Sequence, residues 1–493
     1  MDARAHPRPD RRRGGRAGRA RPDRGARSRE HRQRLCTRDR RPRPRDRRRL
    51  RGDRPRRGRR GARLFDRRRR DARGRAAVTP DELRERIAAL RAAGEELRKR
   101  PARQVIDALA DVLDRWCDRG APERRALERD LPAATGFTPE NVREGLARAF
   151  APWSGEALRA LAERELARGS AFALGHDVTS VLLAGAIPMP ALLSMIAPLA
   201  VRSPALVKTA ARDPITAPLV LRSIAEVDPQ LARCVEVVGF AGADDACMEV
   251  FLSADCVLAT GSDSTIAAVA ARLGPDQTLV RHGHRVSLGL LGHEACGGAA
   301  LDESARGFAL DTALWDQLGC LSPIAVYAAT DATGCERVAT ALACALDAVG
   351  RELPRGEVEA GAAALFAAER AGAELRAAAG QRVAVHAARD ASWAVVCESD
   401  CTPRPAPLHR FVRVHPYPAP EGLGSALAPL AGHLAGVALA GFGTAQAGVE
   451  ADVRAVGASW VCRPGELQSP PLGWPRDGLA PLGSLVRIGA PSH

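Results

Sequence analysis

Short apolar runs alternate with helical segments between Val178 and Val280. Each apolar run has the length of one buried strand, and each segment between two runs fits a helix of about ten residues. Strands separated by such helices form right-handed βαβ units, so the pattern predicts an α/β fold with a parallel sheet covered on both faces. The expected strands are 179–184, 204–208, 235–239, 256–259 and 277–280, and the expected helices are 190–200, 214–224, 244–252 and 264–273.

The segments on either side of this alternation have a different pattern. Thr79-Pro80-Asp81-Glu82 combines a cap residue with an early proline, as helix N-termini do, and leucines then recur at helical spacing. We therefore expect a helical lead-in over 78–170. After Val280, the expected helices are 303–315, 331–349 and 357–379, and the expected strands are 324–328, 393–397 and 411–415.

The formal net charge is +16, and its positive excess lies in residues 1–77. This segment consists of arginine runs with almost no apolar periodicity, so we expect it to be disordered. One interpretation is an arm that binds nucleic acid or a membrane surface. We favour a second, in which upstream DNA of a GC-rich gene is translated ahead of the true start. No nucleic-acid partner is then expected, and the segment should be dispensable.

Apolar segments and cysteines both favour a cytoplasmic protein. Residues 180–201 carry no charge, but Pro188, Pro190 and Pro198 interrupt them, so a strand followed by a core helix explains them better than a membrane span. The twelve cysteines are scattered, and no pair has the CxxC spacing of a metal site. No apolar segment of a signal peptide follows the basic run, so we expect the protein to stay in the cytoplasm. Its cysteine thiols should then be reduced.

Small and polar residues follow three of the predicted strands. They form Gly185-Ala186-Ile187-Pro188, Leu206-Val207-Lys208-Thr209 and Thr260-Gly261-Ser262-Asp263. Open α/β sheets bind their ligands at the carboxyl ends of the strands, which is where these motifs lie. No GxGxxG follows any strand, but Gly261-Ser262 at a helix start would offer free N–H groups to a pyrophosphate.

Lysine is rare in this chain, since Lys99 and Lys208 are the only two, and Asn141 is the only asparagine. Where arginine is the default cation, a retained lysine is a candidate for a role that arginine cannot fill. We therefore favour a ligand-binding role for Lys208 over a solvated lysine at a strand end.

A nucleophile is predicted at Cys320, which follows Gly319 and precedes a turn at Ser322-Pro323. This context would place the thiol on an exposed loop, where a thiolate can attack if a donor lies near the oxyanion that it creates. A buried structural cysteine is the commoner alternative. The predicted nucleotide-binding sheet that precedes Cys320 favours the nucleophile over a structural cysteine.

In this order, the motifs resemble those of the LuxC-type fatty acyl-CoA reductase family of the aldehyde dehydrogenase superfamily. The resemblance covers about residues 80–488 and implies an aldehyde dehydrogenase-like fold with a Rossmann-like cofactor domain and an α/β catalytic domain. The matching segments are Leu206-Val207-Lys208-Thr209, Gly261-Ser262-Asp263, Gly283-His284-Arg285-Val286-Ser287, Asp316-Gln317-Leu318-Gly319-Cys320-Leu321-Ser322-Pro323, Pro470-Pro471-Leu472-Gly473-Trp474 and Asp477-Gly478.

Composition and the resemblance together predict four segments along the chain. They are the arginine-rich segment 1–77, a helical lead-in with the nucleotide-binding domain over 78–283, the catalytic domain over 284–440, and a C-terminal segment over 441–493 that packs back on the core. The resemblance also implies a homo-oligomer and an acyl-protein synthetase or transferase as a partner.

The implied reaction is the NADPH-dependent reduction of an acyl-CoA to the aldehyde, with Cys320 as the acyl acceptor. The cofactor would lie along Gly185, Ile187, Gly261 and Ser262, with Lys208 and Thr209 at its adenosine ribose or phosphate. NADPH is favoured over NADH because Arg212, and no acid, follows the lysine, so a 2′-phosphate meets no repulsion. An acyl phosphate or a carrier-bound acyl group is the alternative substrate.

Three positions depart from the pattern that the resemblance implies. Pro475-Arg476 stands where the family tends to have a histidine after Trp474. His284 stands about where hydrolytic relatives have a glutamate, and it could protonate or orient the thiohemiacetal oxygen, although a structural histidine is an equal alternative. Ala186 replaces an asparagine whose amide should donate to the oxyanion. Without this donor, two alternatives remain for the protein: a slow enzyme, or a paralogue that binds without turnover.

Overall fold

The computed structural model describes residues 78–168, 171–417 and 423–487, so the expectations for residues 1–77 lie outside the described residues. The helical lead-in is confirmed and ends in a two-stranded hairpin. Thr79 caps its first helix, since the Glu82 N–H donates to Thr79 Oγ1 (3.3 Å) and the Thr79 N–H donates to Glu82 Oε2 (2.7 Å). The elements are α2 (Pro80–Lys99), α3 (Ala102–Cys117), α4 (Pro122–Thr135), α5 (Pro139–Phe150), α6 (Gly155–Leu166), β1 (Ala167–Arg168) and β2 (Ala171–Phe172).

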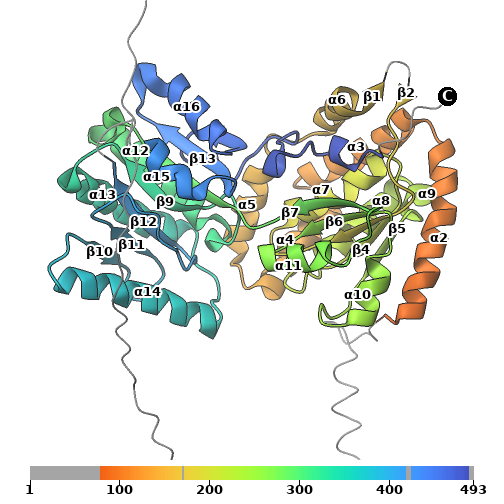
Figure 1. Ribbon diagram of the computed structural model, residues 1–493, viewed down its shortest axis with the longest axis horizontal. Coiled ribbons are helices and arrows are strands. Elements are labelled where there is room, and N and C mark those ends of the chain that lie inside the picture. Colours follow the sequence, from red (N-terminus) through yellow and green to blue (C-terminus); the bar gives the residue numbers. More distant parts are fainter. Residues whose placement is uncertain (1–77, 169–170, 418–422, 488–493) are drawn as a thin grey trace, which may run out of the picture. The chain divides into compact units, whose positions relative to one another are not determined.

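The first large sheet is parallel, as the sequence predicted, and its strand order is β5-β4-β3-β6-β7 (Figure 1). The order reverses between β3 and β6, so this sheet has a topological switch point at β3. Its strands are β3 (Thr179–Leu182), β4 (Ala205–Lys208), β5 (Val235–Val238), β6 (Cys256–Thr260) and β7 (Thr278–His282). Its helices are α7 (Pro188–Ala200), α8 (Thr216–Val227), α9 (Pro229–Ala232), α10 (Asp245–Phe251) and α11 (Asp263–Ala270).

Both faces of this sheet are buried. On one face α7 and α8 pack against the strands, with α3 behind them, and on the other face lie α2, α10 and α11. Successive strand residues therefore enter different clusters: Val181 and Val207 face the α7 side, whereas Leu182 and Leu206 face the α2 side. This double burial explains why the strands read as continuous apolar runs.

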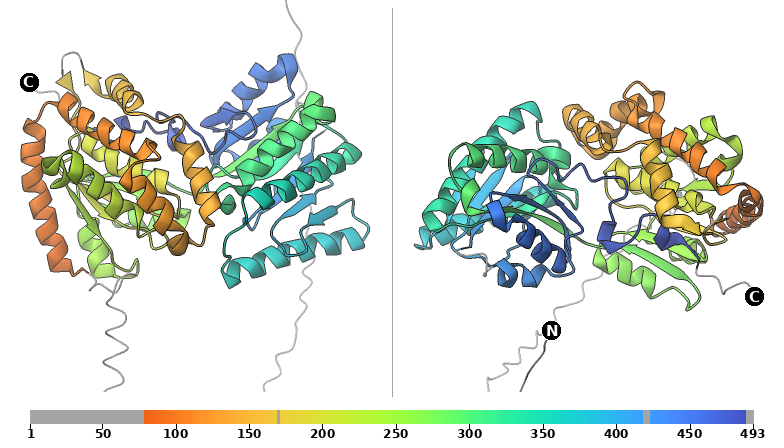
Figure 2. Two further views of the ribbon diagram at one scale, coloured as in Figure 1. Left: turned by 180° about the vertical axis from the view of Figure 1, so that it is seen from behind. Right: turned by 90° about the horizontal axis from the view of Figure 1, so that it is seen from above.

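The second large sheet has the order β10-β11-β12-β9-β8-β13-β14, and only its β10–β11 pair is antiparallel. Helices α12 and α13 cover one face, and α14, α15 and α16 the other (Figure 2). Its strands are β8 (Val286–Leu291), β9 (Pro323–Ala328), β10 (Ala384–Ala387), β11 (Ala394–Cys397), β12 (Phe411–Pro416), β13 (Leu434–Ala440) and β14 (Trp460–Cys462). Its helices are α12 (Gly298–Ala313), α13 (Ala332–Glu352), α14 (Ala360–Ala378), α15 (Leu423–Leu427) and α16 (Gln446–Ala455).

Strands β8, β10, β13 and β14 occupy positions where the sequence predicted none. In β8, a side chain at Gly289 would overlap the ring of Phe308 on α12, so this strand needs a residue that strand patterns normally lack. Strand β14 lies within segment 441–493 yet pairs with β13. None of the helices in the described ranges is long and apolar enough to cross a membrane, and α7 has only 13 residues.

The segment after β14 runs from the second sheet back to the helical lead-in. The Trp153 indole donates to the Pro470 carbonyl (2.9 Å), and Glu165 accepts from the backbone N–H groups of Leu482 (2.9 Å) and Gly483 (3.0 Å). This course brings residues near 470–485 beside elements that are more than two hundred positions earlier in the chain.

Candidate active site

Cys320 follows a turn of unusual backbone conformation. In the 3-10 segment η2 (Leu314–Gln317), Trp315, Asp316 and Gln317 have φ angles of 56°, 50° and 64°. Three consecutive left-handed residues without a glycine cost roughly 1–2 kcal/mol each, so surrounding contacts must stabilise the turn.

A buried ion pair holds the middle of this turn. Arg410, which is 1 % exposed, donates to Asp316 Oδ1 through Nη2 (2.6 Å) and Nε (3.0 Å), and the Gly356 N–H donates to Oδ2 (3.0 Å). Asn141 on α5 accepts from the Trp315 N–H (2.7 Å) and donates to the Ala313 carbonyl (2.8 Å). The turn is thus fixed from both the helical lead-in and β12.

The residues beside the cysteine are fixed in the same way. The Gln317 amide donates to the carbonyls of Pro323 (2.8 Å) and Phe411 (2.9 Å) and accepts from the Phe411 N–H (2.8 Å). The buried hydroxyl of Ser287 donates to the Cys320 carbonyl (2.7 Å). Together these bonds orient the peptide that carries the thiol.

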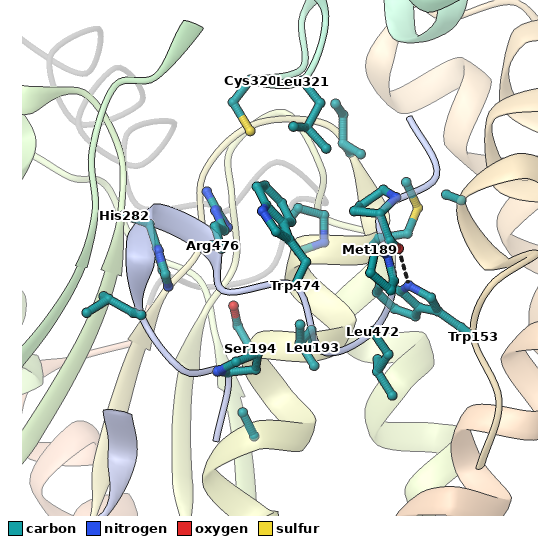
Figure 3. Close-up of a pocket in the computed structure, with 18 of the residues that line it drawn as sticks. Trp153, Met189, Leu193, Ser194, His282, Cys320, Leu321, Leu472, Trp474 and Arg476 are labelled. Carbon is teal, nitrogen blue, oxygen red and sulfur yellow. Dashed lines mark hydrogen bonds between the residues drawn. The ribbon is translucent and has the colours of Figure 1, made fainter. Parts of the chain in front are cut away.

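Cys320 is partly exposed and lines a mainly apolar cavity between the two sheets (Figure 3). Its Sγ points into this cavity, whose walls come from α5, α7, the ends of β6 and β7, and the segment after β14. Ile187 closes one side, because a Cβ at Gly319 would lie 2.9 Å from its Cδ1. The other apolar walls are Ala149, Trp153, Met189, Pro190, Leu193, Ala197, Leu258, Val280, Leu321, Pro470, Pro471, Leu472, Trp474, Leu479, Ala480 and Pro481.

One end of the cavity carries a cluster of charged groups, here called the Asp477 cluster, which comprises His282, Arg285, Arg476 and Asp477. Asp477 is 3 % exposed and accepts from His282 Nδ1 (2.7 Å), with Arg285 Nε at 3.0 Å and Arg476 Nε at 3.9 Å. His282 and Arg476 line the cavity itself. Burial raises the pKa of Asp477, but its bond to His282 and the charge of Arg476 outweigh that effect and lower the pKa, so Asp477 is a carboxylate.

The Asp477 cluster also acts on the thiol. Burial raises the pKa of Cys320 above that of a free cysteine, and Asp477 adds to this rise, while Arg476 and Arg285 oppose it. Burial lowers the pKa of His282 despite its bond to Asp477, so the imidazole is neutral at pH 7. Cys320 and His282 line the same cavity, and a neutral imidazole there could act as the base that a thiol with a raised pKa needs.

A second site lies at the carboxyl edge of the first sheet. Lys208, Gly261 and Ser262 line this groove together with Thr260 and Thr265, and none of the lining residues that the structure describes is acidic. Lys208 is 8 % exposed and its Nζ lies 4.9 Å from the centre of the Phe240 ring, and burial lowers its pKa. A buried cation beside the start of a helix fits the phosphates of a dinucleotide cofactor.

The remaining predicted site residues do not gather at one site in the structure. Gly185 has a φ of 86°, and Thr209 donates its N–H to the Val238 carbonyl (3.1 Å) without lining the groove. Ile187 lines the Cys320 cavity instead of the groove. His284 is exposed, with its backbone N–H bonded to Asp263 (2.9 Å), and it does not line the Cys320 cavity.

Sequence reasoning missed several residues of this site. His282 and Arg476 line the cavity of Cys320, Asp477 bonds His282, and Asn141 and Arg410 hold the turn before the cysteine. From the sequence, Arg476 is only a departure from the family pattern and Asp477 only part of a matching segment. Ala186 is buried in the apolar cluster around α7, so it supplies no donor to the cavity.

Comparison with known sequences gives a family match over most of the chain. The model of the acyl-CoA reductase (LuxC) family matches residues 97–488. The long-chain acyl-protein thioester reductase of Vibrio harveyi is 26% identical over 249 residues, which cover 46% of this chain and 50% of that protein. The same-named protein of Photorhabdus luminescens is 26% identical over 247 residues, covering 45% and 49%. The chain spans about half the length of the curated relatives it matches.

Solved structures show the fold. An NAD-dependent benzaldehyde dehydrogenase from Corynebacterium glutamicum superposes with a TM-score of 0.60 at 16% identity, covering 78% of this chain and 86% of that one. A betaine aldehyde dehydrogenase from Staphylococcus aureus gives 0.61 at 14% identity, covering 83% and 86%. The predicted fold class is therefore confirmed, and the chain is a member of the acyl-CoA reductase (LuxC) family with an aldehyde dehydrogenase-like fold.

Proposed function

We propose that this protein reduces a long-chain acyl thioester to the aldehyde, with NADPH as the reductant and Cys320 as the acyl acceptor. One observation carries the proposal: the thiol of Cys320 points into an apolar cavity that also holds a neutral imidazole, that of His282. An apolar wall suits an aliphatic chain, and the adjoining imidazole suits proton transfer at its thioester end. The names of the curated relatives agree with an acyl thioester.

Proton transfer is assigned to His282 in place of His284. Asp477 accepts from His282 Nδ1, which leaves Nε2 as the nitrogen that exchanges protons. His282 takes the proton of Cys320 as Sγ attacks the thioester carbon, and then returns it to the departing thiol. The apolar walls exclude the water that would otherwise hydrolyse the acyl-enzyme.

The groove beside Lys208 is the proposed cofactor site. Lys208 would contact the adenosine phosphate or ribose, and Gly261 with Ser262 would face the pyrophosphate. A reduced nicotinamide supplies the hydride that converts the acyl group to the aldehyde level. The groove has no acid to repel a 2′-phosphate, whereas Arg212 is exposed and lies within electrostatic reach of His409 instead of lining the groove. Arg272 also lines the groove, but its guanidinium is paired with Asp245 (2.6 Å). We therefore assign the preference for NADPH to Lys208.

Replacing Lys208 by methionine should raise the KM for NADPH by roughly 10- to 100-fold, because a charge-assisted hydrogen bond contributes about 1.5–3 kcal/mol. The KM for the acyl substrate should stay within about twofold, since that cavity lies elsewhere. The matched control is Lys99→Met, the chain's only other lysine, which is exposed and paired with Glu96. Equal cofactor KM values in the two variants, or better turnover with NADH than with NADPH, would remove Lys208 from the phosphate site.

The acyl donor is tested by a panel of long-chain acyl groups carried on CoA, on a protein thiol and on phosphate. Aldehyde should form from the thioesters and far more slowly from the acyl phosphate. A protein-bound donor is the second candidate, because the curated relatives are named for acyl-protein thioesters. A higher kcat/KM for the protein-bound group would make a protein the substrate, and an acyl-protein synthetase or transferase the implied partner. Absence of aldehyde from every donor would overturn the proposed function.

A further inference from the structure

Among the described residues that line the Cys320 cavity, Arg476 is the only lysine or arginine. Its side chain is 20 % exposed, and its nearest carboxylate oxygen, that of Asp477, is 3.9 Å away. Asp477 is instead held at closer range by His282 and Arg285. Within the described ranges, the Arg476 guanidinium donates no hydrogen bond, so its donors are available to an anion in the cavity.

The local fold fixes the backbone that carries this guanidinium. It belongs to the 3-10 turn η6 (Arg476–Gly478), in which Asp477 and Gly478 have φ angles of 57° and 78°. The Trp474 indole anchors the preceding residues by donating to Ser459 Oγ (3.0 Å). Figure 3 shows Arg476 on the side of the cavity toward which the Sγ of Cys320 points.

A cation in an apolar cavity is stabilised by a negative charge. The proposed chemistry at Cys320 creates two such charges in succession. The thiolate is the first, and the oxygen of the tetrahedral intermediate is the second. The turn after β3 offers no side-chain donor, because Ala186 contributes only a buried methyl group. The other charges near the thiol are Arg285, which contacts Asp477, and the Asp477 carboxylate with its partner His282.

We infer that the Arg476 guanidinium binds the negative charge that develops at Cys320, first on the thiolate and then on the carbonyl oxygen of the attacked thioester. The inference rests on the proposed function. As the Sγ–C bond forms, the C=O π pair moves to oxygen, where Arg476 donates to it. When the carbonyl reforms, the C–S bond to the departing thiol breaks, and that sulfur takes from His282 the proton that Cys320 gave up.

The first test needs no acyl substrate. Carbamidomethylation of Cys320 by iodoacetamide is followed by peptide mass spectrometry across pH in the native protein and in Arg476→Gln. Because a nearby cation lowers a thiol pKa, the midpoint should rise by about one pH unit in the variant. Arg476→Lys, which keeps the charge, should shift it by much less. Arg463→Gln, an exposed arginine of the same segment, should leave it unchanged.

The second test measures single-turnover acylation of Cys320 by a long-chain acyl-CoA without cofactor. Arg476→Gln should slow it by roughly 100- to 1000-fold, as loss of one oxyanion donor does, and Arg476→Lys should restore part of the rate. Thermal melts that match the native protein would show that the variants fold.

The outcomes separate the two proposals. A native protein that acylates normally, with Arg476→Gln equal to it in both tests, overturns the role of Arg476 alone. A shifted alkylation midpoint in a native protein that never acylates supports the contact between Arg476 and the thiolate and overturns the proposed function.

Discussion

Cys320→Ala should abolish the acyl adduct at this position and lower aldehyde formation by at least about 1000-fold, because the covalent step then lacks its proposed acceptor. Cys320 is the cysteine whose Sγ points into the apolar cavity beside His282. The measurement is peptide mass spectrometry after incubation with a long-chain acyl-CoA, together with an aldehyde assay. The control is Cys344→Ala, because Cys344 is an exposed thiol on α13 that any reactive acyl donor can modify.

The pH dependence of this adduct follows from the surroundings of the thiol. Burial raises the pKa of Cys320, so little thiolate exists at neutral pH, and alkylation without substrate should increase into the alkaline range, with a midpoint above the value of about 8.5 for a free thiol. An adduct on Cys296 or Cys344 that survives in Cys320→Ala would assign the nucleophile elsewhere. A midpoint below 7 would mean that the cations of the Asp477 cluster outweigh burial.

The parallel strands β3–β7 could be predicted because both of their faces are buried. Such strands read as apolar runs, and the turns between them carry small residues of the proposed cofactor site. Strand β13 has the sequence Leu434-Ala-Gly-Val-Ala-Leu-Ala440, whose alanines and glycine favour no strand by themselves. It becomes a strand because β8 and β14 flank it, which is a tertiary effect.

The position of the imidazole depends on where β7 ends. His282 and His284 are separated only by Gly283, and the sequence alone does not say which one still belongs to the strand. In the structure β7 continues to His282, which therefore faces the cavity, whereas His284 lies beyond the strand and is exposed. Arg476 and Asp477 reach the cavity through the return of the C-terminal segment, which no local pattern predicts.

Residue rarity identified one functional candidate and would have identified another. Lysine is scarce in this chain, and Lys208 lines the groove proposed for the cofactor. Asn141 is the only asparagine and is 0 % exposed, where its amide bonds Trp315 and Ala313. The scarcity of asparagine in this chain likewise indicates a specific role for Asn141, which is that of a buried amide with fixed partners.

Arg410→Met should destabilise the protein by about 3–5 kcal/mol, because it leaves the Asp316 carboxylate buried without its cation. Asp316 is 3 % exposed and takes two hydrogen bonds from Arg410. The measurement is urea unfolding followed by tryptophan fluorescence, which includes the buried Trp315. The control is Arg351→Met, an exposed arginine paired with Asp347 on α13, which should change the unfolding free energy by less than about 0.5 kcal/mol.

The double variant Asp316→Asn/Arg410→Met distinguishes a general loss of stability from release of the turn. It removes both charges, so it should be more stable than Arg410→Met alone. It still lacks the bonds that oppose the strain of three left-handed residues, roughly 1–2 kcal/mol each, so the turn before Cys320 should relax. Hydrogen exchange at the Trp315 N–H, which is bonded to Asn141, should then speed up, and the rate of Cys320 acylation should fall even where the fold is recovered. Unchanged exchange at Trp315 in both variants would show that Asn141 and Gln317 hold the turn without the ion pair.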